Sequence, residues 1–131
     1  MGSGTREYKH AELTSAIIGT FYDVYNELGY GFLEKVYENA LDYELKKRGC
    51  RVHQQAPAEV FYDGLLVRKY YADLLVEDAV IVELKAAEGI AEEHEAQLIN
   101  YLKASDLMIG LLMNFGPKPQ VRRKVYETAR H

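Results

Sequence analysis

The chain has 131 residues, of which 48% are hydrophobic and 27% are charged, and its formal net charge is −4. A chain of this size and composition can bury a core of its own, which indicates a single globular domain. The acidic balance excludes a protein that coats nucleic acid by bulk electrostatic attraction, although it permits an enzyme that touches a few phosphates.

Residues 1–8 begin Met-Gly-Ser-Gly-Thr and are expected to form a flexible leader, so the domain is assigned to residues 9–131. No apolar run reaches membrane-spanning length, and no signal-peptide pattern is present at the N-terminus. Cys50 is the only cysteine, which fits a reducing compartment. We therefore expect a cytoplasmic protein without a membrane partner.

Two amphipathic helices are predicted first. In the first, over about residues 9–28, apolar side chains recur at steps of three and four: Leu13, Ile17, Phe21, Val24 and Leu28. The second covers about residues 32–48, ends before Gly49, and is expected to turn these side chains inward: Leu33, Val36, Tyr37, Ala40, Leu41 and Leu45. Glu34 lies in its first turn, where its position alone indicates a carboxylate favoured by the helix dipole.

A three-stranded meander is predicted next. Ala58–Tyr62 and Leu65–Leu75 flank Asp63-Gly64, which is typical of a type I′ hairpin turn. The apolar residues of a following strand, from Val80 to Leu84, indicate burial on both faces. The last two strands also contain three charged residues that are costly to bury without partners: Asp73, Glu83 and Lys85.

Whether the turn between these two strands has an odd or an even number of residues decides on which face of the sheet Asp73 lies. Glu83 and Lys85 are two residues apart and share a face of the sheet. We predict a loop of odd length, such as Glu77-Asp78-Ala79, which would place Asp73 opposite Glu83, close enough to share a divalent cation. A two-residue loop would put the two carboxylates on opposite faces. An ordinary ion pair with Lys85 at a sheet edge is the alternative interpretation.

The last third of the chain predicts a helix over residues 89–104, a buried strand over residues 107–113 and a loop that begins at Asn114. One face of this helix contains His94, Gln97 and Tyr101. These side chains are either hydrogen-bonded core residues or the wall of a site. Residues 121–126 predict an edge strand, with a helix as the alternative. Strand, helix and strand in this order imply a right-handed crossover and a parallel pair inside a mixed sheet.

The sequence resembles the PD-(D/E)xK nuclease superfamily in its RecB-like variety. The resemblance rests on Asp73, on Glu83-Leu84-Lys85 and on Gln97 with Tyr101. The segment Gly31-Phe-Leu-Glu34-Lys-Val-Tyr37 also resembles the small GxxExxY family, which is assigned to that superfamily. Ala72 stands where many relatives have proline. The resemblance covers residues from about 13 to 126 and implies a restriction-endonuclease-like mixed sheet flanked by helices.

The resemblance also implies site residues and a cofactor. Mg²⁺ or Mn²⁺ would be held by Glu34, Asp73, Glu83 and the backbone carbonyl of Leu84. Lys85 is similar to the residue that orients the attacking water and offsets charge on the phosphorane. Gln97 and Tyr101 resemble the wall that positions the phosphate or Lys85, and we expect Gln97 to contact the site and Tyr101 to reach its rim. A hard cation and a protonated lysine suit phosphodiester hydrolysis, which needs activated water and a counter-charge.

Two functions remain open at this point. The first is a Mg²⁺-dependent nuclease acting on DNA, which the complete set of Glu34, Asp73, Glu83 and Lys85 favours. The second is a module with the nuclease fold that binds a protein or a nucleic acid without cleaving it. The acidic balance and small size favour the second, or a nuclease that works as a homodimer or with a basic protein partner.

Overall fold

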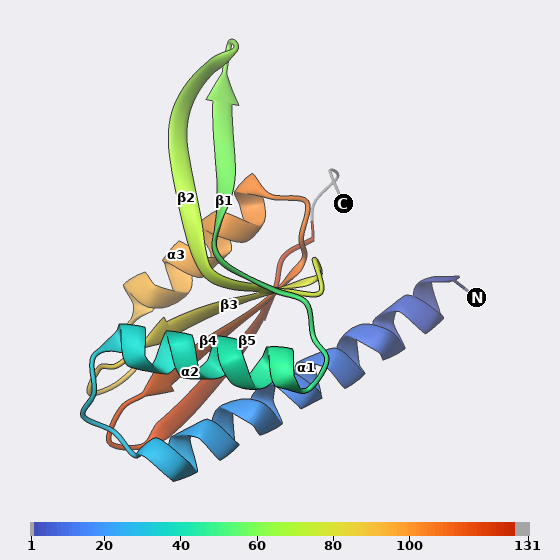
Figure 1. Ribbon diagram of the computed structural model, residues 1–131. Helices are drawn as coiled ribbons and strands as arrows, with labels where there is room; N and C mark the ends of the chain where they lie inside the picture. Colours follow the sequence, from blue (N-terminus) through green and yellow to red (C-terminus); the bar gives the residue numbers. More distant parts are fainter. Residues whose placement is uncertain (1, 128–131) are drawn as a thin grey trace.

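A five-stranded mixed sheet forms the centre of the molecule, with two helices on one face and one helix on the other (Figure 1). The computed structural model describes residues 2–127, with side chains from residue 10 onward. In chain order the elements are α1 (Gly2–Leu28), α2 (Glu34–Lys47), β1 (Val52–Tyr62), β2 (Leu65–Val76), β3 (Val80–Lys85), α3 (Glu92–Ala104), β4 (Ile109–Phe115) and β5 (Pro119–Val125). Residues 2–8, which were expected to form a flexible leader, continue α1 as helix.

The strands lie in the sheet in the order of the sequence, β1-β2-β3-β4-β5. Neighbouring strands are antiparallel except β3 and β4, which are parallel and are connected through α3. The predicted mixed α/β sheet, its parallel pair and its edge strand β5 are therefore confirmed. No helix within residues 2–127 is both long and apolar enough to cross a membrane.

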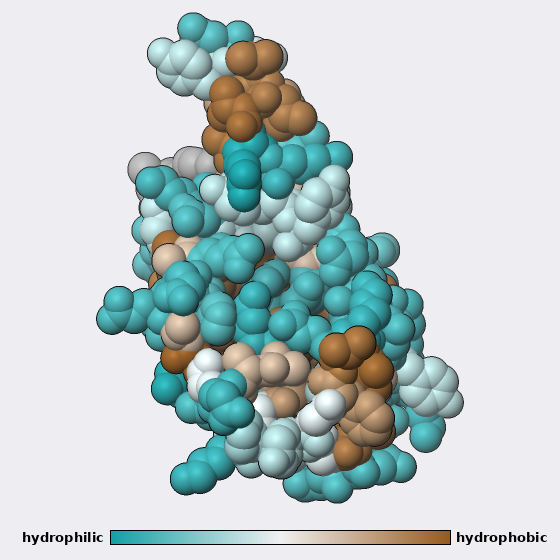
Figure 2. All heavy atoms as spheres, turned by 90° about the vertical axis from the view of Figure 1, so that its left-hand side faces the viewer, coloured by the Kyte–Doolittle hydropathy of each residue, from teal (hydrophilic) through white to brown (hydrophobic). Residues whose placement is uncertain are grey.

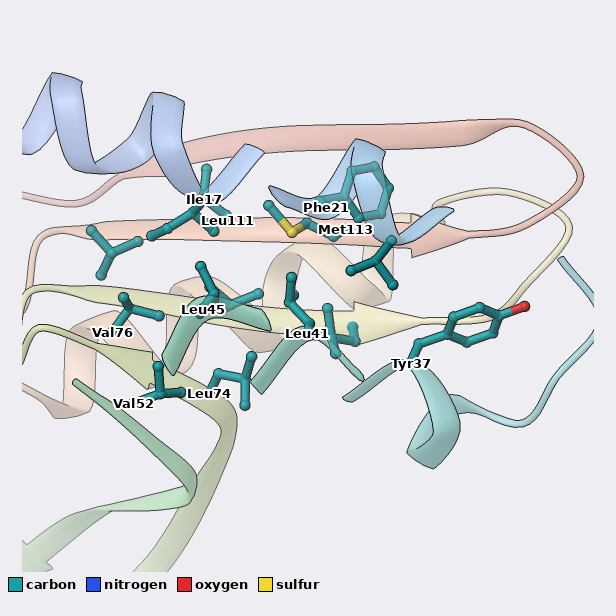
Figure 3. Packing of buried hydrophobic residues seen from close by; sticks show 14 of the residues in the cluster. Ile17, Phe21, Tyr37, Leu41, Leu45, Val52, Leu74, Val76, Leu111 and Met113 are labelled. Atoms are coloured by element: carbon teal, nitrogen blue, oxygen red, sulfur yellow. The ribbon is translucent and has the colours of Figure 1, made fainter. Parts of the chain in front are cut away.

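Two hydrophobic cores lie on opposite faces of the sheet. The larger core packs α1 and α2 against the sheet, with Ile17, Phe21, Tyr37 and Leu41 fully buried in it (Figure 3). The smaller core packs α3 on the other face, through side chains that include Leu98 and Leu102. Each fully buried leucine or phenylalanine stabilises the fold by about 1.5–3 kcal/mol relative to an exposed one, so both layers hold β3 in place.

The buried face of α2 differs from the predicted one. Leu33 precedes the helix in extended conformation and is 81% exposed, and Val36 is 40% exposed, so both were wrongly assigned to the inner stripe. The helix is instead buried along two adjacent rows, one of them apolar and the other acidic: Tyr37, Leu41 and Leu45 beside Glu38 and Asp42. The phase of the helix therefore turns a carboxylate, Glu38, toward the sheet.

The β1–β2 hairpin bends away from the sheet and projects beyond the body of the molecule (Figure 1). Residues an even number apart along a strand should share a face, yet Val52 and Ala58 lie in opposite cores, as do Leu74 and Ala72. The change of face occurs at Gln55, whose φ of 53° is left-handed, between the pairs Gln54–Leu74 and Ala56–Ala72. This bend brings Asp73, in the opposite strand, to the edge of the α2 layer.

Candidate active site

A three-residue turn sets the register of β2 against β3. Val76 pairs with Val80 and Leu74 pairs with Val82, with Glu77 and Asp78 both in left-handed conformation in the turn, at φ 55° and 51°. The odd loop length predicted for this turn is confirmed. Asp73 and Glu83 consequently follow the last regular pair and lie across from each other.

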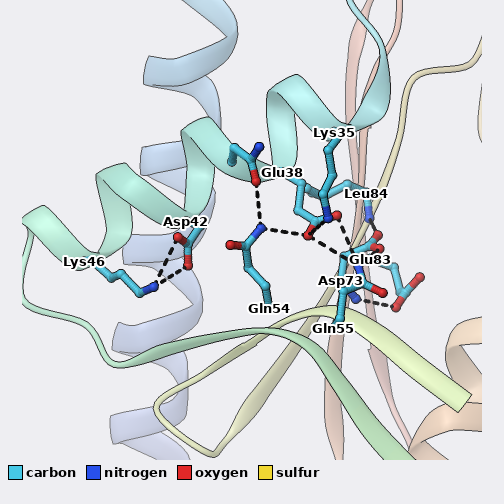
Figure 4. A network of polar contacts seen from close by, with 10 residues as sticks. Lys35, Glu38, Asp42, Lys46, Gln54, Gln55, Asp73, Glu83 and Leu84 are labelled. Carbon is cyan, nitrogen blue, oxygen red and sulfur yellow. Dashed lines mark hydrogen bonds and ion pairs between the residues drawn. The ribbon is translucent and has the colours of Figure 1, made fainter.

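Each of these two carboxylates accepts a backbone hydrogen bond from the neighbouring strand. The N–H of Leu84 donates to Asp73 Oδ2 at 2.7 Å, and the N–H of Asp73 donates to Glu83 Oε1 at 3.1 Å (Figure 4). Regular pairing of β2 with β3 ends at Leu74 and Val82, so these side chains replace ladder hydrogen bonds where the strands separate. The two hydrogen bonds fix both carboxylates at the point where β2 and β3 separate.

Burial and like charge raise the pKa of both carboxyl groups. Burial is the largest cause for Glu83, followed by the charge of Asp73, and together they raise its pKa to about 8 against the opposing effect of Lys85. The pKa of Asp73 is raised mainly by burial, and the charges of Glu38 and Glu34 add to the effect. The pair therefore lies in a position where a cation would relieve an excess of negative charge.

The donor chemistry of the site fits a hard divalent cation, because carboxylate oxygens are the ligands that Mg²⁺ and Mn²⁺ prefer. Glu34 lies at the start of α2 with an exposed side chain, near enough for its charge to raise the pKa of both Asp73 and Glu83. The side chains of residues 10–127 nevertheless contain no three acidic, histidine or cysteine groups that converge on one metal position. The predicted ligands are thus neighbours, but their side chains do not surround one common metal position.

Glu38 is a buried carboxylate at this site that the sequence analysis missed. It is 4% exposed and accepts hydrogen bonds from Lys35 Nζ at 2.9 Å and from Gln54 Nε2 at 2.8 Å (Figure 4). The amide of Gln55 lies between Glu38 and Asp73, with Nε2 at 3.2 Å from Glu38 Oε1 and 3.3 Å from Asp73 Oδ1. A polar network therefore connects α2 to Asp73 through the bend in β1.

The segment before α2 is held by Tyr37. Its hydroxyl donates to the carbonyl of Gly29 at 2.7 Å and accepts the N–H of Phe32 at 3.2 Å. Its ring stacks on Phe115 with centroids 4.2 Å apart. Between these contacts Gly31 has a φ of 116°, a conformation that other residues rarely adopt. Gly31 and Tyr37 together fix the entry to α2 and hence the position of Glu34.

Lys85 and the chain that follows it are held by a buried asparagine. Lys85, at the end of β3, is half-buried, pairs in register with Asn114 of β4, and makes no ion pair within residues 10–127. Asn114 is fully buried and holds Ala87 at both backbone groups, accepting its N–H and donating to its carbonyl, each at 2.9 Å. Asn114 was assigned to a loop from the sequence, and its role depends on the parallel pairing of β3 with β4.

Gln97 and Tyr101 lie on the face of α3 that adjoins Glu83. Together with Glu83 they line a cavity of about 220 Å³. Gln97 has an exposed side chain, whereas Tyr101 is 4% exposed and lies deeper than the rim position expected from the sequence. The hydroxyl of Tyr101 donates to the carbonyl of Ala56 at 2.9 Å, and burial raises its pKa to about 12. Tyr101 thus stays neutral and ties α3 to the bend in β1.

The family model for the PD-(D/E)XK nuclease superfamily matches residues 11–124. Among solved structures, the chain is similar to one titled "Crystal structure of SSO0001", with 18% sequence identity and a TM-score of 0.58. The match covers 72% of this chain and 50% of that one, so the chain spans about half the length of the protein it matches. No curated protein matches the sequence. The two matches confirm a restriction-endonuclease-like mixed sheet.

Proposed function

The chain belongs to the PD-(D/E)XK nuclease superfamily, and from this premise we propose that it is a metal-dependent nuclease that hydrolyses phosphodiester bonds in DNA. The observation that carries the proposal is the pair of hydrogen bonds that fixes Asp73 and Glu83 side by side at the end of β2–β3 pairing. Membership of the GxxExxY family is a further proposal, supported by the way Gly31 and Tyr37 set the position of Glu34.

Asp73 and Glu83 would hold Mg²⁺ or Mn²⁺ together with Glu34 and the backbone carbonyl of Leu84. When bound, such a cation lowers the pKa of a water ligand and stabilises charge on the phosphoryl oxygens. The raised pKa values of Asp73 and Glu83 support this assignment, because two adjacent buried carboxyl groups gain from a positive counter-charge. Glu38 would position Asp73 through the amide of Gln55.

The remaining residues act on water and on the substrate. Lys85 follows Glu83 by two residues on the same strand, so its ammonium can orient the attacking water and offset the charge of the pentavalent phosphorane. Gln97 can donate its amide to a phosphate oxygen from the wall of the cavity. Tyr101 keeps its hydroxyl on Ala56 and supports the wall.

A second function, a binding module that does not cleave, is favoured by one observation. No three metal-ligating side chains within residues 10–127 converge on a common point. If the protein is a nuclease, its net charge of −4 supports one that works as a homodimer or with a basic protein partner. The single cysteine supports a cytoplasmic location.

Cleavage of a panel of nucleic acids tests the proposal. Purified protein should cut single-stranded, duplex or branched DNA in Mg²⁺ or Mn²⁺, and EDTA should stop the reaction. The Asp73→Asn variant, purified identically, controls for contaminating host nucleases, because their cleavage would survive the substitution. A wild-type protein that is inert on every DNA form and on RNA would favour the binding module instead.

A further inference from the structure

A groove runs between the β1–β2 hairpin and α3 and ends at Glu83. It consists of the 220 Å³ cavity beside Glu83 and a second cavity of about 500 Å³ farther along α3, and Tyr70 of β2 lines both. We call these two cavities the hairpin groove. Figure 2 shows the hairpin projecting above the body, with apolar side chains gathered near its tip and hydrophilic ones below them.

β2 contributes two cation–ring pairs to the hairpin groove, each formed by residues two apart along the strand. The guanidinium of Arg68 lies 5.2 Å from the ring centroid of Tyr70, and the ammonium of Lys69 lies 5.5 Å from that of Tyr71. All four residues line the cavity that contains Glu83, and Tyr71 is 53% exposed. An exposed ring with a cation over it offers a stacking face for a base and a charge for the adjoining phosphate.

The charges of Arg68 and Lys69 are available to a ligand. Glu59 is the cross-strand neighbour of Lys69, yet neither cation makes an ion pair with any acidic group of residues 10–127. Two cations without an ion pair among residues 10–127 therefore line the cavity that also contains Glu83, in a chain with a net charge of −4. This locally positive charge is complementary to a polyanion that enters along the hairpin.

The second cavity continues the same chemistry. Phe61 of β1, which is 59% exposed, and Tyr70 face Asn100 and Lys103 of α3 across it. Aromatic faces on a groove wall can stack only on bases that have left a double helix. Duplex binding relies instead on many neutralised phosphates, and an acidic chain with so few cations in this groove is poorly suited to supply them.

We infer that the hairpin groove binds a single strand of DNA, with its bases on the rings of Tyr71 and Phe61 and its phosphates on Arg68 and Lys69, and leads that strand to Glu83. The inference rests on the proposed function for the choice of DNA as the polymer. It specifies that function further, because the strand that reaches Glu83 would be unpaired.

Fluorescence anisotropy of labelled oligonucleotides of about a dozen nucleotides, measured in EDTA so that no cleavage occurs, tests the inference. The wild-type chain should bind the single strand at least about tenfold more tightly than the duplex of the same sequence. Tyr71→Ala should weaken single-strand binding by roughly 5- to 100-fold, the effect expected for losing one stacked base, whereas Tyr71→Phe keeps the ring and should change it by less than about twofold. Tyr43→Ala, at a ring on α2 that is 66% exposed, is the matched control and should bind as wild type.

The salt dependence separates the charges from the rings. Replacing both Arg68 and Lys69 with alanine should reduce the slope of log K against log salt by about 1.4, since each phosphate contact on a single strand contributes about 0.7. Tyr71→Ala should leave that slope unchanged. Circular dichroism of each variant checks that the fold is retained.

Several results would overturn the inference. The first three are equal affinity for single strand and duplex, a Tyr71→Ala variant that binds as wild type, and tighter binding to single-stranded RNA than to DNA. The fourth is a dimer in solution that Phe61→Ser dissociates, because it would assign the groove to a second copy of the chain. Single-strand binding without cleavage in any divalent cation would contradict the proposed function and leave this inference intact. Cleavage without strand preference would contradict this inference alone.

Discussion

Replacing Tyr37 with phenylalanine tests how the segment before α2 is held. The substitution keeps the ring on Phe115 and removes a hydroxyl that donates to Gly29 at 2.7 Å and accepts from Phe32 at 3.2 Å. Each such hydrogen bond contributes about 0.5–1.5 kcal/mol net, and water can replace the one at Phe32, which is 49% exposed. We expect the free energy of unfolding to fall by about 1–2 kcal/mol.

Urea unfolding followed by circular dichroism measures this loss, which should appear as a lower midpoint with an unchanged m-value. In a thermal scan the same loss corresponds to a melting temperature lower by roughly 3–5 °C per kcal/mol at this chain length. Tyr43→Phe, at an exposed ring on the same helix, is the control and should stay within about 0.5 kcal/mol of wild type. A Tyr37→Phe variant as stable as this control would refute the reasoning.

Three further predictions concern the surroundings of the site. Glu38→Ala should lower the free energy of unfolding by about 1–3 kcal/mol, because it removes a buried carboxylate that accepts hydrogen bonds from Lys35 and Gln54. The exposed Glu34→Ala should cost less than about 0.5 kcal/mol, and equal effects of the two substitutions in urea unfolding would contradict the network. Gly116→Ala would place its Cβ against the carbonyl oxygen of Ala87, well inside van der Waals contact, so we expect the free energy of unfolding to fall by more than about 2 kcal/mol. A variant as stable as wild type would show that this contact is absent. In EDTA, the free energy of unfolding should fall as pH rises from about 4.5 to about 8, because the folded state holds the proton of Glu83, whose pKa is about 8, more tightly than the unfolded state does. Glu83→Gln should flatten this part of the pH profile, and an unchanged slope would count against the raised pKa.

The sequence predicted the order of the elements and the register that brings Asp73 opposite Glu83. Both depend on local rules, namely the periodicity of apolar residues and the parity of a loop whose ends are marked by Val76 and Val80. The same rules misplaced Leu33 and Val36, because periodicity alone does not fix where a helix begins. Here α2 begins at Glu34, after a segment that the hydroxyl of Tyr37 holds through the carbonyl of Gly29.

The parts of the site that the sequence did not predict depend on contacts between distant segments. The periodicity of apolar residues does not single out Glu38, which is buried where Gln54 and Gln55 of β1 reach it across the bend. That bend arises from the left-handed conformation of Gln55, a residue type with no strong preference for it. Asn114 likewise acquires its role only when β4 pairs beside β3 and Ala87 comes within reach.

The central claim is that Asp73 holds the metal while Lys85 acts on the water and the transition state. Calorimetric titration of Mn²⁺, combined with single-turnover cleavage of the best DNA substrate, tests it most directly. Asp73→Asn should lose both metal binding and cleavage, whereas Lys85→Ala should bind Mn²⁺ as wild type and cleave slower by about 10²–10³. Mn²⁺ binding that persists in Asp73→Asn, or that disappears in Lys85→Ala, would contradict the account.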